Sequence, residues 1–480
     1  MENTTTYNRA KLWQIGLFAL NNTATNVMLF FMMFVSYYLN GIAGIAVVTV
    51  GFLLTAMRIF DGFTDPIIGF IIDRTDTKFG KFRPMMVLGY VIMLIAILIL
   101  FNTLHLVPEA IRIVYFVLIY GIYVIGYTFQ TACTKAAQPC LTNDPKQRPL
   151  FSLFDGIYNT ILFAAGAWIV SNVLVPKHQG FTQGLFSEFS AMALIASAVL
   201  TVCAIIGIAK KDRKELFGLG VGKTPKVKFS DYVDVIKNNR GIQMLIVAAS
   251  TDKLSLTTMG NAVVAVIIFG IVGGNYAAFG ELSVWTTIPT FVLLFFGVAY
   301  ARKMGQKQAL VLATWLSIAC AVGLGALILF GDMTSLSFAN INFFTILFAV
   351  LYVLLKGTSG VAGNIVIPMI ADCADYETYR SGKYVPGMMG TLFSFVDKLI
   401  SAFATTVVAL ICAAIGFADS FPTVDTPFST ALLYGGVFMF VGLPILGWIA
   451  SLIAMKFYPL NAEKMAEIQT EIQKIKDSAE

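Results

Sequence analysis

Twelve stretches of mostly apolar residues, each long enough to cross a bilayer as a helix, constrain this chain more than any other feature. A spanning helix needs about 20 such residues. Only 12% of the residues are charged, about half the share found in soluble domains. Most of the surface must therefore face lipid, and we expect an all-α polytopic membrane protein. The stretches cover residues 12–39, 43–72, 84–104, 108–136, 149–174, 187–209, 241–270, 277–300, 308–330, 342–371, 386–416 and 430–456.

The basic residues between these stretches predict the orientation of the chain. If the N-terminus lies in the cytoplasm, 27 of the 33 Lys and Arg residues fall on the cytoplasmic side, whereas Arg112 and Lys177 fall outside. Cytoplasmic loops of membrane proteins carry such an excess. We therefore expect a multi-pass protein of the inner (cell) membrane with both termini in the cytoplasm. Because the basic residues are spread over many short loops without interleaved aromatic residues, we expect no nucleic-acid partner.

The longest polar stretch, residues 210–240, divides the twelve spans into two sets of six. A Gly-x-x-x-x-Arg…Gly pattern follows the second span of each half, at Gly69–Gly80 and at Gly297–Gly305. Parallel six-span repeats are typical of the major facilitator architecture. We expect this fold in a monomer, with these parts: an N-terminal six-helix bundle at 1–209, a cytoplasmic central loop at 210–240, a C-terminal six-helix bundle at 241–456 and a cytoplasmic tail at 457–480.

The second span carries charged side chains in the middle of the membrane. Arg58, Asp61 and Asp65 fall on one stripe of a helix, and Asp61 lies about 17 Å from its cytoplasmic end, near the midplane. An ionisable group there costs about 2.5–3.5 kcal/mol on insertion scales. The two carboxylates, one turn apart, can be neutralised by a proton, by Na⁺ or by a basic side chain. We interpret the stripe as a coupling-ion site; the alternative is an ion pair with Arg58 that holds helices together.

Further polar residues interrupt other spans. Lys398 lies near mid-depth in span eleven, where it could neutralise Asp61 and Asp65 when the ion is absent, and it is also a candidate for binding the substrate. The alternative is that it pairs with its neighbour Asp397 or reaches toward the membrane surface. For Asp252, Lys253 and Lys356, we favour structural ion pairs. The first span contains a polar cluster that should face the bundle interior. Its residues, candidates for binding a hydroxyl-rich ligand or for helix–helix hydrogen bonds, are Asn21, Asn22, Thr23 and Asn26.

The loops resemble those of the glycoside–pentoside–hexuronide:cation symporters, which include the melibiose and glucuronide carriers. The match begins with D-x-x-x-D-P-x-x-G followed by D-R-T…G-K-F-R-P, at Asp61–Pro84. It continues at Ala371–Tyr379, at Leu392–Phe403 and at Phe457–Leu460, so it runs through the chain in order. The closest likeness is to the glucuronide-carrier branch.

This resemblance implies symport of a sugar or glycoside with Na⁺ or H⁺ by alternating access, without a cofactor. It maps the family's cation site onto Asp61, Thr64, Asp65 and Thr128, its helix-eleven lysine onto Lys398 and its helix-two arginine onto Arg58. Thr131 stands where the melibiose carrier has an acidic sugar-binding residue, and span five has no interior base to match that carrier's sugar-binding arginine. The cation site is thus retained, whereas the sugar-contacting residues differ.

Charged residues at the cytoplasmic ends of the two halves predict an inner gate. We expect ion pairs between them that break as the halves rock, because exposed pairs contribute only about 0–1 kcal/mol each; simple positive-inside topology is the alternative. The first half contributes Asp73, Arg74, Lys81 and Arg83, and the second contributes Asp372, Asp375, Glu377 and Arg380.

Two other functional classes compete with the symporter hypothesis. A polytopic prenyltransferase would use Asp61, Asp65 and the acidic cluster after span ten with Mg²⁺, but Arg58 shares the stripe and no pyrophosphate-binding partner motif follows. A carrier of the same fold for a lipid or a drug-like molecule would need an apolar cavity. The Asn and Thr residues of spans one and four instead favour recognition of hydroxyl groups.

Overall fold

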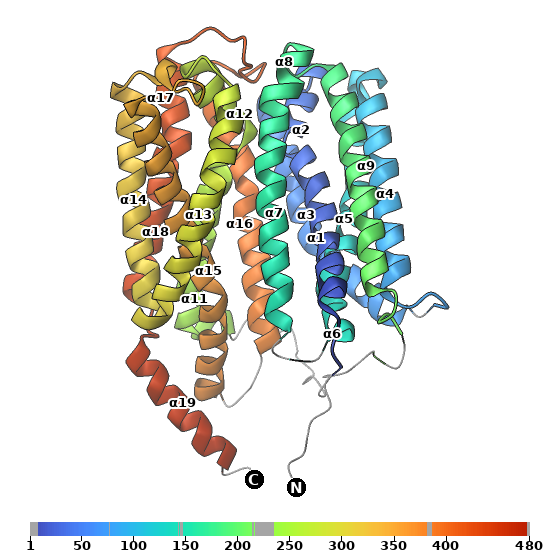
Figure 1. Cartoon of the computed structure of the whole chain (residues 1–480), viewed down its shortest axis with the longest axis vertical. Helices are drawn as coiled ribbons and strands as arrows, with labels where there is room; N and C mark the ends of the chain where they lie inside the picture. The colour runs from blue at the N-terminus through green and yellow to red at the C-terminus, as the bar shows by residue number, and fades with distance from the viewer. Residues whose placement is uncertain are drawn as a thin grey trace. The chain divides into compact units, whose positions relative to one another are not determined.

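The computed structural model describes residues 8–75, 77–142, 144, 147–213, 216, 235–381 and 386–477. The regular secondary structure of this part of the chain is helical, and loops and one isolated bridge between Thr77 and Gly80 connect the helices (Figure 1). By length and composition, 11 of its helices could cross a membrane, or 12 if one bent pair counts as a single span. The prediction of an all-helical polytopic membrane protein is confirmed.

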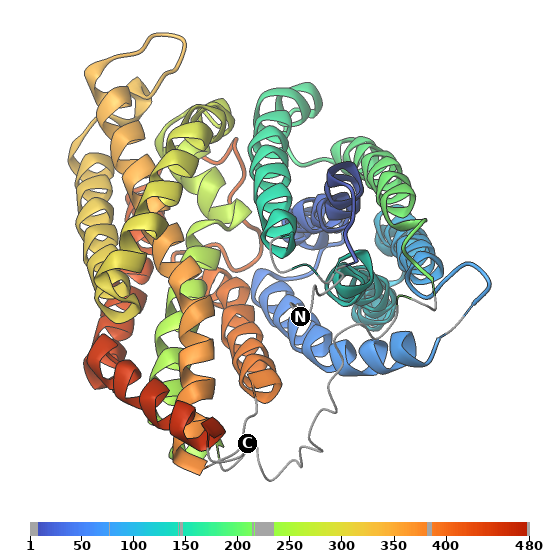
Figure 2. The ribbon, with the colours of Figure 1, turned by 60° about the horizontal axis from the view of Figure 1, so that its bottom comes forward.

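The chain divides into two compact units. The first comprises Met1–Thr224 and Asp419–Phe421, and the second comprises Pro225–Ala418 and Pro422–Glu480. In the first unit, α1 packs against α5, α7 and α9, and α5 also packs against α3 and α4 (Figure 2). The longer helices of this unit are α1 (Leu12–Met32), α3 (Val47–Arg74), α4 (Phe82–Thr103), α5 (Glu109–Ala136), α7 (Arg148–Trp168) and α9 (Gln183–Ile208). Its shorter elements are α2 (Val35–Tyr37), η1 (Tyr38–Ile42), η2 (Leu104–Leu106), α6 (Gln138–Leu141), η3 (Ile169–Leu174) and α8 (Val175–His178).

In the second unit, α11 packs against α16, α18 and α15, and α15 packs against α13 and α14. The longer helices of this unit are α11 (Arg240–Met259), α13 (Ala277–Met304), α14 (Gln306–Phe330), α15 (Phe343–Ser381), α16 (Pro386–Ala414), α18 (Leu443–Phe457) and α19 (Ala462–Asp477). Its shorter elements are α12 (Ala262–Ala265), η5 (Val266–Val272), η6 (Met333–Ser335), α17 (Thr430–Val437) and η7 (Phe438–Gly442).

The seventh predicted span, residues 241–270, is divided in the structure. α11 ends at Met259, and the chain bends by 49° before it continues through α12 and η5 to Val272. Gly260 lies at the break, and the Asn261 side chain accepts a hydrogen bond from the backbone N–H of Val263 at 2.9 Å. Asn261 thus caps the N-terminus of α12, and such a cap marks the start of a new helix rather than a continuation of α11.

The tenth predicted span, residues 342–371, is shorter than the helix that contains it. α15 has 39 residues, so it is roughly 58 Å long at 1.5 Å per residue. A hydrocarbon core is only about 30 Å thick. The helix therefore extends well beyond the membrane, and its last turns carry the predicted gate residues Asp372 to Arg380.

Gly80 and Gly305, the last glycines of the repeated sequence pattern, both lie in the turn before a helix. Each precedes a helix, α4 or α14, and each has a positive φ, 97° and 90° respectively. A Cβ atom at Gly80 would lie 2.3 Å from Oδ2 of Asp212, so glycine is required there by space as well as by conformation. The carboxylate of Asp212 in turn accepts the first backbone N–H groups of α4, those of Phe82 and Arg83 at 3.1 and 2.9 Å.

Candidate functional site

The carboxylate predicted to bind the coupling ion lies against two threonine hydroxyls. Asp61 and Thr64 lie one turn apart on α3, and Thr128 lies on the neighbouring α5. The Thr128 hydroxyl is 3.3 Å from Oδ1 of Asp61 and 2.9 Å from the Thr64 hydroxyl. Asp61 is 3% exposed and Thr128 is fully buried. The structure thus brings together three of the four predicted cation ligands, through oxygen atoms of the kind that Na⁺ or a proton would use.

Arg58 and Asp65 complete the polar stripe of α3. Arg58 lies within electrostatic reach of Asp61 and also of three tyrosines on α5, Tyr120, Tyr123 and Tyr127. Asp65, the fourth predicted ligand, is half-buried. The sequence reasoning missed the tyrosines, although their spacing of three and four residues places them on one face of a helix. The surroundings of the acidic stripe are therefore partly phenolic.

A second polar cluster joins α1 to α7. The Asn22 side chain donates to Oδ1 of Asp155 at 2.6 Å, and Asn26 donates to Oδ1 of Asn159 at 2.8 Å. Asn159 also donates to Oδ1 of Asp155 at 2.9 Å, which links the two pairs. We call Asn22, Asn26, Asp155 and Asn159 the α1–α7 network. It contains two of the four predicted ligand-binding residues of span one, and an acid in span five that the sequence reasoning did not consider.

Within the described part of the chain, no hydrogen bond links the other predicted substrate-binding residues of this unit to the α1–α7 network. The Asn21 side chain donates to the backbone oxygen of Gln130 and to the hydroxyl of Thr134, so it joins α1 to α5. Thr131 donates to carbonyl groups of its own helix. The hydroxyl of Thr23 is buried without a recorded partner. Asn21 thus forms helix–helix hydrogen bonds, which is one of the two roles that the sequence allowed for it.

In the second unit, Lys253 of α11 and Asp397 of α16 form an ion pair. Lys398, the next residue, is half-buried on α16, and its predicted pairing with Asp61 and Asp65 stays a prediction. The amine of Lys356 lies 5.5 Å from the centre of the Tyr352 ring. A structural ion pair is therefore present for Lys253, with a partner on another helix.

Several of the predicted gate residues have partners within their own units. Arg83 pairs with Asp212 at 3.4 Å, and Arg74 lies over the Phe70 ring. The other partnerships are those of Glu377 with Arg380 at 2.7 Å, of Glu377 with Asn239 at 2.9 Å and of Asp375 with Gln469 of α19 at 2.6 Å. The backbone N–H of Lys81 donates to Asp212 at 2.9 Å, and Asp372 is half-buried. The side chain of Asp73 lies outside the described residues, and the gate itself stays a prediction.

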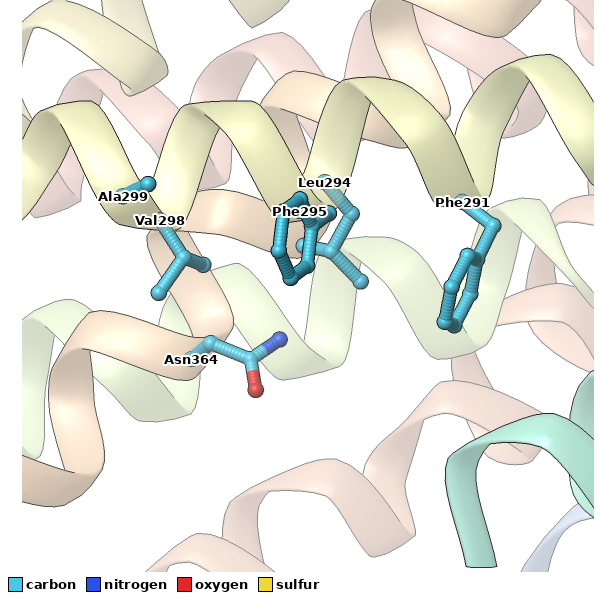
Figure 3. A pocket seen from close by; sticks show the side chains of 6 residues that line it. All are labelled: Phe291, Leu294, Phe295, Val298, Ala299 and Asn364. Carbon is cyan, nitrogen blue, oxygen red and sulfur yellow. The ribbon is translucent and has the colours of Figure 1, made fainter. Parts of the chain in front are cut away.

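An open groove of about 270 Å³ lies between α13 and α15 of the second unit. Figure 3 shows the Asn364 side chain of α15 pointing toward the aromatic and aliphatic side chains of α13. The Asn364 amide, the one polar side chain of this groove, donates to the backbone oxygen of Gly360 in its own helix at 2.8 Å. The lining residues are Phe291, Leu294, Phe295, Val298, Ala299 and Asn364.

A family model described as MFS/sugar transport protein matches residues 17–462 of the chain. The lactose permease of Lactobacillus delbrueckii subsp. bulgaricus is 25% identical over 442 residues, which are 88% of this chain and 65% of that protein. The isoprimeverose transporter of Lactiplantibacillus pentosus is 24% identical over 89% of this chain and 84% of its own length. The glucuronide carrier protein homolog of Escherichia coli K12 is 22% identical, covering 92% and 90%.

Solved structures share the fold at low sequence identity. The nucleoside transporter NupG superposes with a TM-score of 0.61 at 12% identity, over 93% of this chain and 99% of that one. A bacterial homolog of the human lysosomal transporter Spinster gives a TM-score of 0.60 at 12% identity, over 96% and 97%. These likenesses show the fold that the chain has in common with other membrane transporters.

Proposed function

The chain belongs to the MFS/sugar transport protein family, the glycoside/cation symporters of the major facilitator superfamily, and we propose that it carries a sugar or glycoside into the cell together with Na⁺ or H⁺. The resemblance found in the sequence is confirmed by the family match, and membership of a transporter family excludes the prenyltransferase alternative. The substrate would be a glucuronide, another glycoside or a pentoside. The observation that carries the proposal is the contact of the Thr128 hydroxyl with the buried carboxylate of Asp61, 3.3 Å away.

We assign the cation to the oxygens of Asp61, Thr64, Asp65 and Thr128. A carboxylate buried at mid-depth is costly unless a cation or a proton neutralises it. Threonine hydroxyls can turn their lone pairs toward a cation, because each oxygen accepts as well as donates. Arg58 and Lys398 act as charge partners when the ion has left. The same site thus alternates between an ion-bound state and an internally neutralised state.

We assign the sugar to the α1–α7 network of the first unit. Carboxylate and amide groups such as those of Asp155 and Asn22 can bind neighbouring hydroxyls of a sugar ring. Cation and sugar would then favour the same closed state. By linkage, each would raise the affinity for the other by the same factor.

Uptake into membrane vesicles tests this proposal. A panel of labelled glycosides, pentosides and uronides is offered under imposed Na⁺ or H⁺ gradients. Accumulation of a sugar driven by one gradient is expected, and Asp61→Asn or Asp65→Asn should abolish the accumulation while leaving part of the sugar binding. Full accumulation in both variants would reject the site. Accumulation of lipid or drug-like probes in place of sugars would favour the carrier of the alternative substrate class.

Two further parts of the proposal concern the ends of the spans. Both termini lie in the cytoplasm, which cysteine labelling from each side of the membrane tests at an engineered C-terminal residue. The charged residues at Asp73–Arg83 and Asp372–Arg380 close the inner gate. Neutralising Asp73 and Arg74 together should therefore increase the labelling of interior cysteines from the cytoplasm, and unchanged labelling would count against the gate.

A further inference from the structure

Asp252 is a buried acid that neither the cation site nor the α1–α7 network uses. It lies on α11, which begins at Arg240. At 1.5 Å per residue, Asp252 is roughly 18 Å along the helix, near the middle of a hydrocarbon core about 30 Å thick. It is 6% exposed. A charged carboxylate at mid-depth is costly unless a partner or a bound proton compensates its charge.

The recorded partner of this acid is a hydroxyl. Ser451 of α18, itself fully buried, donates to Oδ2 of Asp252 at 3.2 Å. Oδ1 is buried, and no hydrogen-bond partner is recorded for it among the described residues. The helices are close here, since a Cβ atom at Gly447 of α18 would lie 1.9 Å from Oγ of Ser255 and 2.8 Å from the backbone oxygen of Thr251. The acid is thus held in a tight seam between α11 and α18.

Two of the charged groups near this level of the helices have partners of their own. The neighbouring Lys253 forms its ion pair with Asp397 of α16. Lys356 of α15 lies over Tyr352, and α12 and η7 contain no titratable residue. The other charged residues on these elements are Lys398 of α16, Lys456 of α18 and the inner-end residues Asp372, Asp375, Glu377 and Arg380 of α15. Within the described part of the chain, the contact recorded for the Asp252 carboxyl is that with Ser451.

We propose that Asp252 is a proton-binding site of the second unit, separate from the Asp61–Asp65 site. A carboxyl group removed from water without a cation is stable only in its neutral form, because desolvation penalises the charge. Oδ1 carries the proton, and Oδ2, as the carbonyl oxygen, accepts the bond from Ser451. A neutral Asp252 then leaves the charge of Lys253, which is paired with Asp397 of α16, as the one charge in the middle of α11.

Infrared difference spectroscopy of the purified full-length protein tests this assignment. The difference between the wild type and Asp252→Asn at neutral pH should contain the carbonyl stretching band of one protonated carboxylic acid, and this band should move to lower frequency in D₂O. Asp332→Asn, at an exposed acid in the loop after α14, is the matched control and should leave the band unchanged. The double variant of Asp61→Asn and Asp65→Asn should retain it, because the proton belongs to the other unit.

Ser451→Ala provides an independent measurement. Loss of the hydrogen bond to Oδ2 should shift the band to higher frequency without removing it. A carbonyl region identical in the wild type and in a folded Asp252→Asn variant would overturn the proposal. If Asp252→Asn does not fold, as judged by circular dichroism, the Ser451→Ala spectrum decides: an unmoved carbonyl region rejects the protonated acid.

Discussion

The hydroxyl of Thr128 on α5 lies 3.3 Å from Oδ1 of Asp61 on α3. The two residues are 67 positions apart in sequence, and both are buried. The contact joins the carboxylate of α3 to a hydroxyl group of α5. If the proposed cation binds at Asp61, this contact lets ligands from two helices, α3 and α5, share the site.

Replacement of Thr128 by valine keeps the volume of the side chain and removes its oxygen. If the hydroxyl is a cation ligand, the variant should need about tenfold more cation for half-maximal sugar uptake, a loss of about 1.4 kcal/mol. The maximal rate at saturating cation should change less. Thr314→Val is the matched control, because Thr314 is equally buried and donates to a carbonyl of its own helix. Equal cation requirements in both variants would remove Thr128 from the site.

Replacement of Asp155 by alanine should weaken sugar binding without changing the cation requirement that is measured at saturating sugar. The acid accepts from Asn22 and Asn159 in the α1–α7 network, and a hydrogen bond to a charged group contributes about 1.5–3 kcal/mol. The KM for the sugar should therefore rise by about 10- to 100-fold. The control is Asn102→Ala, at an exposed amide that bonds within its own helix. A change in the cation requirement alone would place Asp155 in the ion site instead.

The positions of the spans could be predicted from the sequence because the bilayer imposes them. A spanning helix needs a long apolar stretch whatever its neighbours are, so most predicted bounds lie within a few residues of the helices observed. The break at Gly260 and Asn261 was harder to see, since both residues are uncharged and lie within an apolar stretch. The length of α15 beyond the membrane was also missed, because hydropathy falls at the membrane surface whereas the helix continues.

Neighbouring helices could not be deduced from the sequence alone. Asp252 and Lys253 are adjacent in the chain, yet consecutive helical positions point about 100° apart. The acid therefore contacts α18 and the lysine contacts α16. Asp155 could not be recognised for a related reason, because its role depends on the Asn22 side chain of α1 that donates to it.

Exchanging the charges of Lys253 and Asp397 should reveal how much their ion pair contributes to the stability of the protein. Either Lys253→Asp or Asp397→Lys alone leaves two like charges in contact, so each should lower the stability of the protein. Removing one partner of a fully buried pair costs about 3–5 kcal/mol; because the Lys253 side chain is 47% exposed, we expect about 1–3 kcal/mol here. The double exchange should restore most of the thermal stability measured in detergent. A double variant as unstable as the sum of the two single variants would show that the contact contributes nothing.

Substitution of Gly80 by alanine should destabilise the first unit. The backbone there has φ = 97°, which disfavours residues with a Cβ atom, and the added atom would lie 2.3 Å from the carboxylate of Asp212. That carboxylate holds the first N–H groups of α4, so its displacement adds to the strain. We expect a loss of about 2 kcal/mol or more, measured as a lower midpoint of thermal unfolding. Gly69→Ala in α3 is the control, because no atom lies within 4 Å of a Cβ built there, and alanine favours a helix interior by about 1 kcal/mol. Equal midpoints for the two variants would show that the turn before α4 tolerates a side chain.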